Sequence, residues 1–141
     1  MKKLFIPFML FVSSLITTYE LSAAAQSTAQ ENRMSEIVYL NSSNLQQVLN
    51  SSQPVIIDVY ADWCGPCKKI APIFQELHHE LGNRYLFVKM NSDEQRALAE
   101  RFNVRSLPTL LFIKDGKEVG RSSGFVNKSQ LASMIQKYLG K

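Results

Sequence analysis

Cysteine and histidine are scarce in this sequence. Its 141 residues include two cysteines, Cys64 and Cys67, and two histidines, the adjacent His78 and His79. A structural zinc ion takes four ligands, and adjacent histidines are wrongly spaced to complete such a site with the cysteines. Covalent haem attachment requires a histidine directly after the second cysteine, where this chain has Lys68. We therefore expect no metal and no organic cofactor.

Long apolar runs are also missing. The N-terminal apolar run at residues 4–16 would form a helix of roughly 20 Å, whereas the hydrocarbon core of a bilayer is about 30 Å thick. Lys2 and Lys3 precede this run, and small residues at 22–25 follow it. A basic start, a short apolar run and small residues together are typical of a secretory signal peptide.

This pattern sets the predicted domain organisation. We predict a signal peptide at residues 1–25, with cleavage after Ala25 or, alternatively, Ala24. The polar residues 26–35 show no periodicity and are interpreted as a flexible segment. A single domain then occupies residues 36–141. An uncleaved signal that anchors the protein to the membrane is the alternative.

A strong excess of one charge is absent as well. The chain has 16 basic and 12 acidic residues, for a formal net charge of +4. The basic residues are scattered and are not interleaved with aromatic residues. This distribution argues against a nucleic-acid-binding protein.

The two cysteines lie at the junction of two predicted elements. An apolar, β-branched run at Val55–Tyr60 precedes them, and a helical pattern follows them. Three positions along a helix turn through about 300°, so both sulfur atoms share one face. Cys64 falls at the helix start, where unpaired backbone N–H groups and the helix dipole favour a thiolate. Cys67 lies one turn inside.

Core packing and a permanent disulfide are the alternatives to a redox role for this pair. Two buried cysteines can simply fill a core, but packing does not explain the glycine and proline between them. A permanent disulfide over so short a loop removes little chain entropy and is a poor staple. Pro66 suits the first helical turn, and Gly65 leaves room for a substrate to approach Cys64. A redox-active dithiol therefore accounts for the pattern best.

Apolar periodicity divides the domain into alternating elements. Predicted strands occupy residues 37–40, 55–60, 85–90, 110–113 and 118–121. Predicted helices occupy residues 45–49, 64–81 and 93–102, and a last one begins at residue 127 or 128. Ser92 or Asp93 is the expected cap of the third helix. A hairpin turn at residues 114–117 joins the last two strands. This order predicts an α/β fold, a mixed sheet with helices on both faces.

The sequence WCGPCK at residues 63–68 resembles the active-site signature of thioredoxins. The resemblance extends over residues 36–139, roughly the whole predicted domain. It implies a thioredoxin fold, with a central mixed β-sheet of about five strands flanked by four helices. It also implies a thiol–disulfide oxidoreductase that needs no cofactor beyond the Cys64–Cys67 pair.

Asp58 is an acidic residue inside a predicted buried strand. An unpaired buried carboxylate is costly, so Asp58 should be protonated or paired. An aspartate at a strand end that reaches water is the alternative interpretation. The resemblance to thioredoxins implies that Asp58 accepts a proton from Cys67 and that Lys89 pairs with Asp58.

Trp63 is the only tryptophan and directly precedes Cys64. It could be a core aromatic residue. Beside a reactive sulfur, we expect it instead to form an apolar docking surface for substrate with Gly65, Pro66 and Pro108.

Further substrate-binding positions come from the resemblance. It implies a cis peptide bond before Pro108, a substrate contact at Leu107, and a groove flanked by Gly124. Leu107 replaces the isoleucine that is frequent there, and Tyr60 stands where many thioredoxins have tryptophan.

The predicted function is that of an exported protein-disulfide reductase, with Cys64 as nucleophile and Cys67 as resolving cysteine. The expected partners are protein disulfide substrates and an electron donor, either a membrane protein or a soluble thiol. The expected location is the bacterial periplasm, and the expected state is a monomer. A disulfide donor or isomerase of the same fold, a donor dedicated to one client pathway, and a non-catalytic binding module are the alternatives.

Overall fold

The computed structural model describes residues 36–140, so the predicted signal peptide and flexible segment lie outside the described residues. The described residues contain five strands, β1 (Val38–Tyr39), β2 (Val55–Tyr60), β3 (Leu86–Asn91), β4 (Thr109–Lys114) and β5 (Lys117–Ser123). The helices are α2 (Leu45–Leu49), α3 (Gly65–Leu81), α4 (Arg96–Arg101) and α5 (Lys128–Leu139). Within residues 36–140, no helix combines the length and the apolar character needed to cross a membrane.

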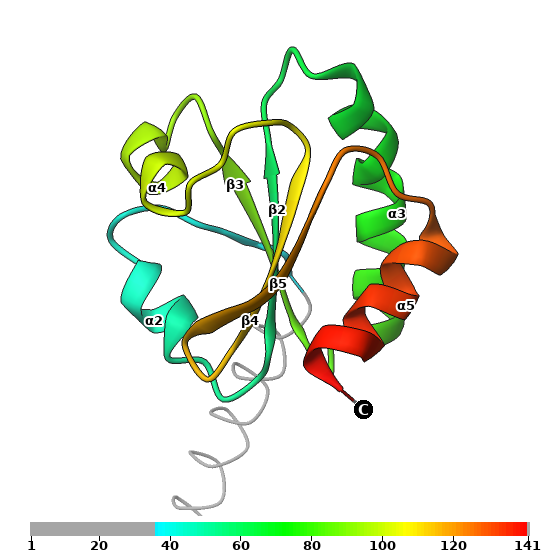
Figure 1. Cartoon of the computed structure of the whole chain (residues 1–141). Helices are drawn as coiled ribbons and strands as arrows, with labels where there is room; N and C mark the ends of the chain where they lie inside the picture. The colour runs from blue at the N-terminus through cyan, green and yellow to red at the C-terminus, as the bar shows by residue number, and fades with distance from the viewer. Residues whose placement is uncertain (1–35, 141) are drawn as a thin grey trace, which may run out of the picture. The chain divides into compact units, whose positions relative to one another are not determined.

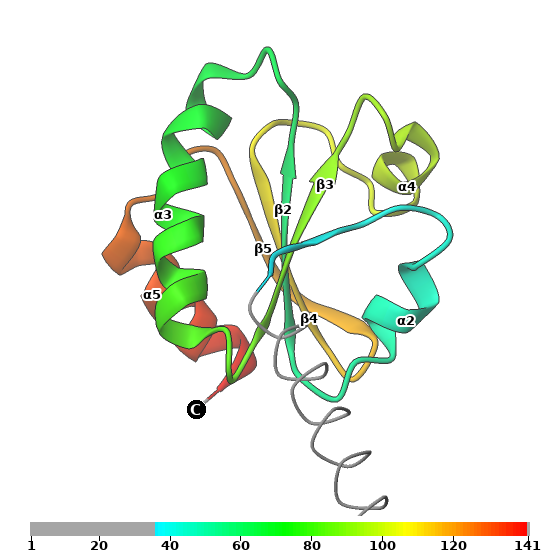
Figure 2. The same ribbon diagram turned by 180° about the vertical axis from the view of Figure 1, so that it is seen from behind.

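The strands form one mixed sheet in the order β1-β3-β2-β4-β5. Strand β3 runs parallel to both β1 and β2, whereas β4 is antiparallel to both β2 and β5. Helices α3 and α5 cover one face of this sheet, and α2 and α4 cover the other (Figures 1 and 2). The predicted α/β architecture is confirmed.

Strand β2 is the centre of the sheet. It is buried over Val55–Val59 because β3 and β4 flank it and helices cover both its faces. A strand in this position must be apolar on both faces, which accounts for its β-branched composition. Its side chains alternate between two cores: Ile56 packs under α3 and α5, whereas Ile57 and Val59 pack on the α2 and α4 side. Asp58 is therefore buried at the middle of the fold.

The chain leaves β2 and enters α3 through the cysteines. Cys64 is the N-cap of α3, with an extended backbone (φ −78°, ψ 108°), and Gly65 is the first helical residue. Pro66 follows in the first turn, where the missing N–H has no intrahelical partner to lose. The predicted arrangement, with Cys64 at the helix start and Cys67 one turn inside, is confirmed.

Helix α4 begins later than predicted. The expected helix over 93–102 with a cap at Ser92 or Asp93 is wrong, because α4 starts at Arg96. The side-chain Oδ1 of Asn91 accepts hydrogen bonds from the backbone N–H groups of Asp93 and Glu94, at 3.0 and 3.4 Å. These bonds close a turn directly after β3, and α4 begins only after that turn.

Strands β4 and β5 form the predicted hairpin. Asp115 and Gly116 connect them, with φ values of 52° and 74°. Both central residues of the favoured two-residue hairpin turns of type I′ need positive φ, which explains the Asp-Gly pair. The last helix, α5, begins as predicted at Lys128, with Asn127 and Gln130 forming a capping box.

Candidate active site

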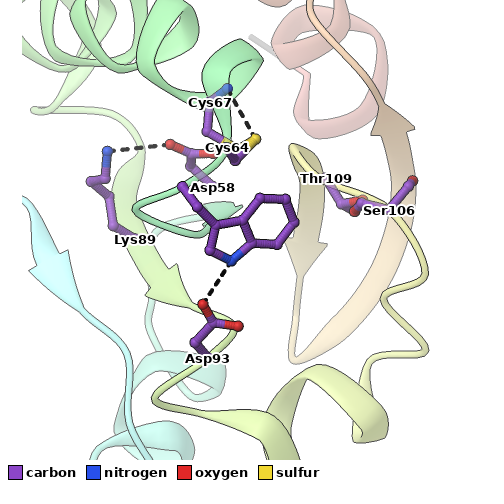
Figure 3. Close-up of a disulfide and its surroundings, with 8 residues drawn as sticks. Asp58, Cys64, Cys67, Lys89, Asp93, Ser106 and Thr109 are labelled. Carbon is purple, nitrogen blue, oxygen red and sulfur yellow. Dashed lines mark hydrogen bonds and ion pairs between the residues drawn. A yellow bond between two sulfur atoms is a disulfide. The ribbon is translucent and has the colours of Figure 1, made fainter.

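Cys64 and Cys67 form a disulfide at the N-terminus of α3. Their sulfur atoms lie 2.17 Å apart and their Cα atoms 5.3 Å apart. The Sγ atom of Cys64 also accepts a hydrogen bond of 3.2 Å from the backbone N–H of Cys67 (Figure 3). A thiolate formed at Cys64 would thus face a backbone donor and the positive end of the helix dipole.

Asp58 and Lys89 form an ion pair between neighbouring strands. They are register partners in the β2–β3 pair, and the Lys89 Nζ lies 3.4 Å from the Asp58 Oδ2 (Figure 3). Within residues 36–140 no other group hydrogen-bonds to the Asp58 carboxylate, so Lys89 is its polar partner there. Burial raises the pKa of the Asp58 carboxyl above its usual value, and the positive charge of Lys89 offsets part of that rise.

A small cavity borders one member of the ion pair, Lys89, and one cysteine, Cys67. It has a volume of about 150 Å³, and Cys67 and Lys89 both line it, together with Tyr60 and Lys68. Because Lys89 also contacts Asp58, a single side chain links the cavity beside Cys67 to the buried Asp58 carboxylate. The predicted pairing of Asp58 with Lys89 is confirmed, and Asp58 does not lie at a water-exposed strand end.

Trp63 lies on the surface beside the disulfide, with 72% of its area exposed. It is therefore not a core residue. Its indole Nε1 donates a hydrogen bond of 2.9 Å to Oδ2 of Asp93. Gly65 and Pro66 are exposed next to it, and an added Cβ at Gly65 would meet no atom within 4 Å. Pro108, the fourth residue of the predicted docking surface, is buried, so it does not share this exposed surface, and the docking of a substrate there stays a prediction.

Sequence reasoning missed Asp93 as a member of this site. The sequence pattern indicates a helix cap at Asp93, but the carboxylate of this residue accepts the hydrogen bond from Trp63. A signal was available in the topology: β2 and β3 are parallel neighbours, so the residues just after each strand meet at the same sheet edge. Trp63 and Asp93 both occupy such positions.

Leu107, Pro108 and Gly124 form the other side of the site. The Leu107–Pro108 peptide bond is cis, as the resemblance implied. The side chain of Leu107 packs against the buried cluster of Ala61, Cys64 and Cys67. The N–H of Gly124 donates a hydrogen bond of 2.8 Å to the carbonyl oxygen of Pro108. Gly124 has a φ of 90°, a backbone conformation that favours glycine.

Comparisons with known proteins agree with this geometry. The family model named Thioredoxin matches residues 36–137. The chain belongs to the thioredoxin family. A thioredoxin from Haemophilus influenzae is 43% identical over 107 residues, which cover 75% of this chain and 100% of that protein. An M-type chloroplastic thioredoxin from Spinacia oleracea is 43% identical over 105 residues, covering 74% of this chain and 58% of that one.

Solved structures give the same result. A mutant thioredoxin from Halobacterium salinarum NRC-1 superimposes with a TM-score of 0.68 at 32% sequence identity, covering 74% of this chain and 92% of that one. A thioredoxin from Malassezia sympodialis gives a TM-score of 0.67 at 30% identity, covering 73% and 90%. The domain therefore has the thioredoxin fold that the sequence predicted.

Family membership establishes the general chemistry. This protein is a thiol–disulfide oxidoreductase of the thioredoxin type, and it acts on protein disulfides through a redox-active cysteine pair without an external cofactor. Among residues 36–140, no cluster of histidine, cysteine, aspartate or glutamate is arranged to hold a metal ion.

Proposed function

We propose that this thioredoxin is an exported protein-disulfide reductase. The observation that carries the proposal is the Cys64–Cys67 disulfide at the start of α3, together with the buried Asp58, whose ion-pair partner Lys89 lines the same cavity as Cys67. Export is supported by the signal-peptide pattern at residues 1–25. The bacterial periplasm is the compartment that we propose.

The reduced protein carries two thiols. The Cys64 thiolate attacks one sulfur of a substrate disulfide, forming a mixed disulfide and releasing the other substrate sulfur as a thiolate. Cys67 then transfers its proton to Asp58 and attacks the Cys64 sulfur. This attack forms the Cys64–Cys67 disulfide and releases the second substrate thiolate. The substrate gains two electrons and the enzyme loses them.

Asp58 is suited to accept this proton. It is fully buried, and burial raises the pKa of its carboxyl group. The pKa of Asp58 is therefore closer to that of a thiol than the pKa of an exposed carboxyl group is. The Lys89 charge keeps the ionised form accessible. The same pair can return the proton when the disulfide is next reduced.

The direction of the reaction is the finer part of the proposal. Gly65 and Pro66 between the cysteines resemble the reducing members of the family. Oxidising compartments do not reduce disulfides by themselves, so the cycle needs an electron donor, either a membrane protein or a soluble thiol. We propose that the protein works as a monomer.

The redox state of the protein in cells tests the direction. Cells are quenched with acid, free thiols are alkylated with a maleimide of large mass, and the exported fraction is separated by gel electrophoresis. A reductase is present largely as the dithiol while its donor functions and accumulates as the disulfide when the donor is removed. A disulfide donor is oxidised in both conditions, and that result would overturn the proposal.

The mass of the intact exported protein tests the location. Cleavage after Ala25 gives a chain that begins at Gln26. Recovery of the full-length chain in the membrane fraction would support the anchored alternative instead. A variant with both cysteines replaced by serine separates catalysis from partner binding, because a non-catalytic binding module would keep its function.

A further inference from the structure

The ammonium group of Lys89 lies between two side chains of strand β2. Its Nζ is 3.4 Å from the Asp58 Oδ2 and 4.6 Å from the centre of the Tyr60 ring. Asp58 and Tyr60 are two residues apart on one strand, so their side chains point to the same face of the sheet. Lys89 is the register partner of Asp58 on β3 and thus contacts both.

The ion pair alone does not fix the position of Lys89. Its Nζ lies 3.4 Å from the nearer carboxylate oxygen, which is a long contact, and its side chain keeps 13% of its area exposed. A lysine ammonium is strongly hydrated and sits on a flexible four-carbon stem, so it can move from a long ion pair into water. An aromatic ring within about 6 Å of a cation attracts it electrostatically and opposes that movement.

We propose that Tyr60 is a positioning residue, whose ring holds the Lys89 ammonium against Asp58 and thereby sets the pH range in which Asp58 keeps its proton. The use of that proton by Cys67 rests on the proposed function. The contact by which Tyr60 positions Lys89 does not depend on that function.

The groups around Tyr60 support a role for the ring rather than for the phenol. Burial raises the pKa of Tyr60, and nearby acidic groups raise it further, so the side chain is neutral at physiological pH. These acidic groups are Tyr39, Asp62, Glu94 and Asp58. Lys68 also lines the cavity beside Tyr60. A neutral phenol offers Lys89 the face of its ring and no charge.

The expected effect has a defined sign. Without the ring, Lys89 spends more time in water, and Asp58 loses part of the positive charge that favours its ionised form. The pKa of Asp58 then rises further. A cation–π contact of ordinary strength corresponds to a shift of about half a pH unit.

The test is a pH titration of the Asp58 side-chain carboxyl carbon by ¹³C NMR. The protein is kept in the disulfide form, so that neither cysteine titrates, and the Asp58→Asn variant assigns the signal. We expect Tyr60→Leu to raise the titration midpoint by about half a pH unit, and Tyr60→Phe to leave it unchanged. Tyr60→Met, which fills more of the space, should give the same shift and replaces Tyr60→Leu if that variant does not fold.

A double-mutant cycle with Lys89 identifies the route of the effect. Lys89→Met should raise the midpoint more than Tyr60→Leu does. In the Lys89→Met background, Tyr60→Leu should add no further shift. An equal shift in both backgrounds would mean that Tyr60 acts through burial of Asp58 and not through Lys89, which would overturn the inference, as would no shift from Tyr60→Leu alone.

Tyr39 provides the matched control. It is the register partner of Lys89 on β1, so it lies on the other side of Lys89 from Asp58, and it is 60% exposed. Tyr39→Leu removes the same kind of ring from a neighbouring strand and should leave the midpoint where it is. A shift as large as that of Tyr60→Leu would show a general effect of aromatic removal and contradict the inference.

A kinetic measurement separates this inference from the proposed role of Asp58. The reduced protein is treated with one equivalent of 5,5′-dithiobis(2-nitrobenzoate); the Cys64 thiolate breaks the disulfide of the reagent, bonds one nitrothiobenzoate and releases the other as a first coloured thiolate. Attack by Cys67 then forms the Cys64–Cys67 disulfide and releases the second coloured thiolate, whose slower phase is the one measured. If Asp58→Asn leaves the pH dependence of this release unchanged, the proton-acceptor role is wrong, while the NMR titration still decides whether Tyr60 positions Lys89.

Discussion

The indole N–H of Trp63 donates a hydrogen bond to Asp93, thirty residues further along the chain. This bond ties the residue before the nucleophile to the turn after β3. The turn is itself held by the side chain of Asn91. A side chain that is 72% exposed would otherwise rotate freely, so the bond orders a surface that a substrate must meet.

Fluorescence can test this restraint, because Trp63 is the only tryptophan. We expect Asp93→Ala to lower the steady-state anisotropy of Trp63, since the freed indole rotates faster. A hydrogen bond of this kind contributes about 1 kcal/mol, so global stability should change little. Glu94→Ala, which removes the neighbouring exposed carboxylate, is the control. Unchanged anisotropy in Asp93→Ala would show that packing alone holds Trp63.

Asp58→Asn should stabilise the folded protein at neutral and alkaline pH. The folded-state pKa of Asp58 is raised, so the folded state binds the proton more tightly than the unfolded chain does. Stability therefore falls as pH rises from the usual aspartate pKa through the raised one, by on the order of 1 kcal/mol for each unit of the rise. The asparagine variant has no such loss.

Urea unfolding of the oxidised protein measures this difference. The gain of Asp58→Asn over the unmodified chain should be large at about pH 8 and should shrink towards about pH 3, below the usual aspartate pKa, where Asp58 is protonated in both the folded and the unfolded chain. Asp62→Asn, at an exposed position, controls for the change in net charge. A gain of equal size at both pH values would contradict the assignment of the effect to ionisation of Asp58.

Cys67→Ser should trap the mixed disulfide. Cys64 can still attack a substrate, but no second sulfur is present to release it, so a covalent complex should accumulate. The rate at which the variant reduces the disulfides of insulin should fall close to zero. Non-reducing gel electrophoresis detects the complex. Cys64→Ser should form none, because Cys67 lies inside the first turn of α3 and not at the N-cap, where the unpaired backbone N–H groups favour a thiolate. A complex of equal yield in Cys64→Ser would reverse the assigned roles.

Gly120→Ala should destabilise the domain. Gly120 lies in β5 opposite Phe112, and a Cβ built there would come within 2.4 Å of the Tyr138 ring. That ring packs on Phe112 with centroids 5.0 Å apart and has little freedom to move. We expect a loss of about 1–3 kcal/mol in chemical unfolding. Strand glycines commonly mark such close approaches.

Two further variants test the cause of this loss. Gly65→Ala adds the same methyl group where no atom lies within 4 Å, so it should be neutral or slightly stabilising. Adding Tyr138→Leu to Gly120→Ala should recover part of the lost stability. Equal losses at Gly65 and Gly120 would contradict a clash with Tyr138 as the cause, because Gly65 has no such neighbour.

The sequence was most informative where the chemistry is local. The placement of Cys64 and Cys67 follows from a buried strand, a helical pattern and their spacing, all within 55–81, and the structure confirms it. The hairpin and the start of α5 were equally local, since Asp115-Gly116 and Asn127 determine their own turn and cap.

Features that depend on strand register were harder to predict. The predicted start of α4 was wrong because several cap-type residues follow β3, and only the structure shows that Asn91 holds the backbone in a turn. The contact of Trp63 with Asp93 was missed for the same reason. The pairing of Asp58 with Lys89 and the cis bond before Pro108 were expected from the family resemblance alone, because neither follows from periodicity.

The direction of the short strand β1 determines where a tether at the amino terminus of the domain would be attached. It runs parallel to β2, so the chain enters the domain towards the amino ends of the central strands, while the disulfide follows the carboxyl end of β2. A tether, tag or solid support joined ahead of Ile37 would thus be attached at the opposite end of β2 from the active-site cysteines. Immobilisation through the amino terminus should therefore preserve turnover, and the same geometry suits both a domain released by signal cleavage and one anchored by an uncleaved signal.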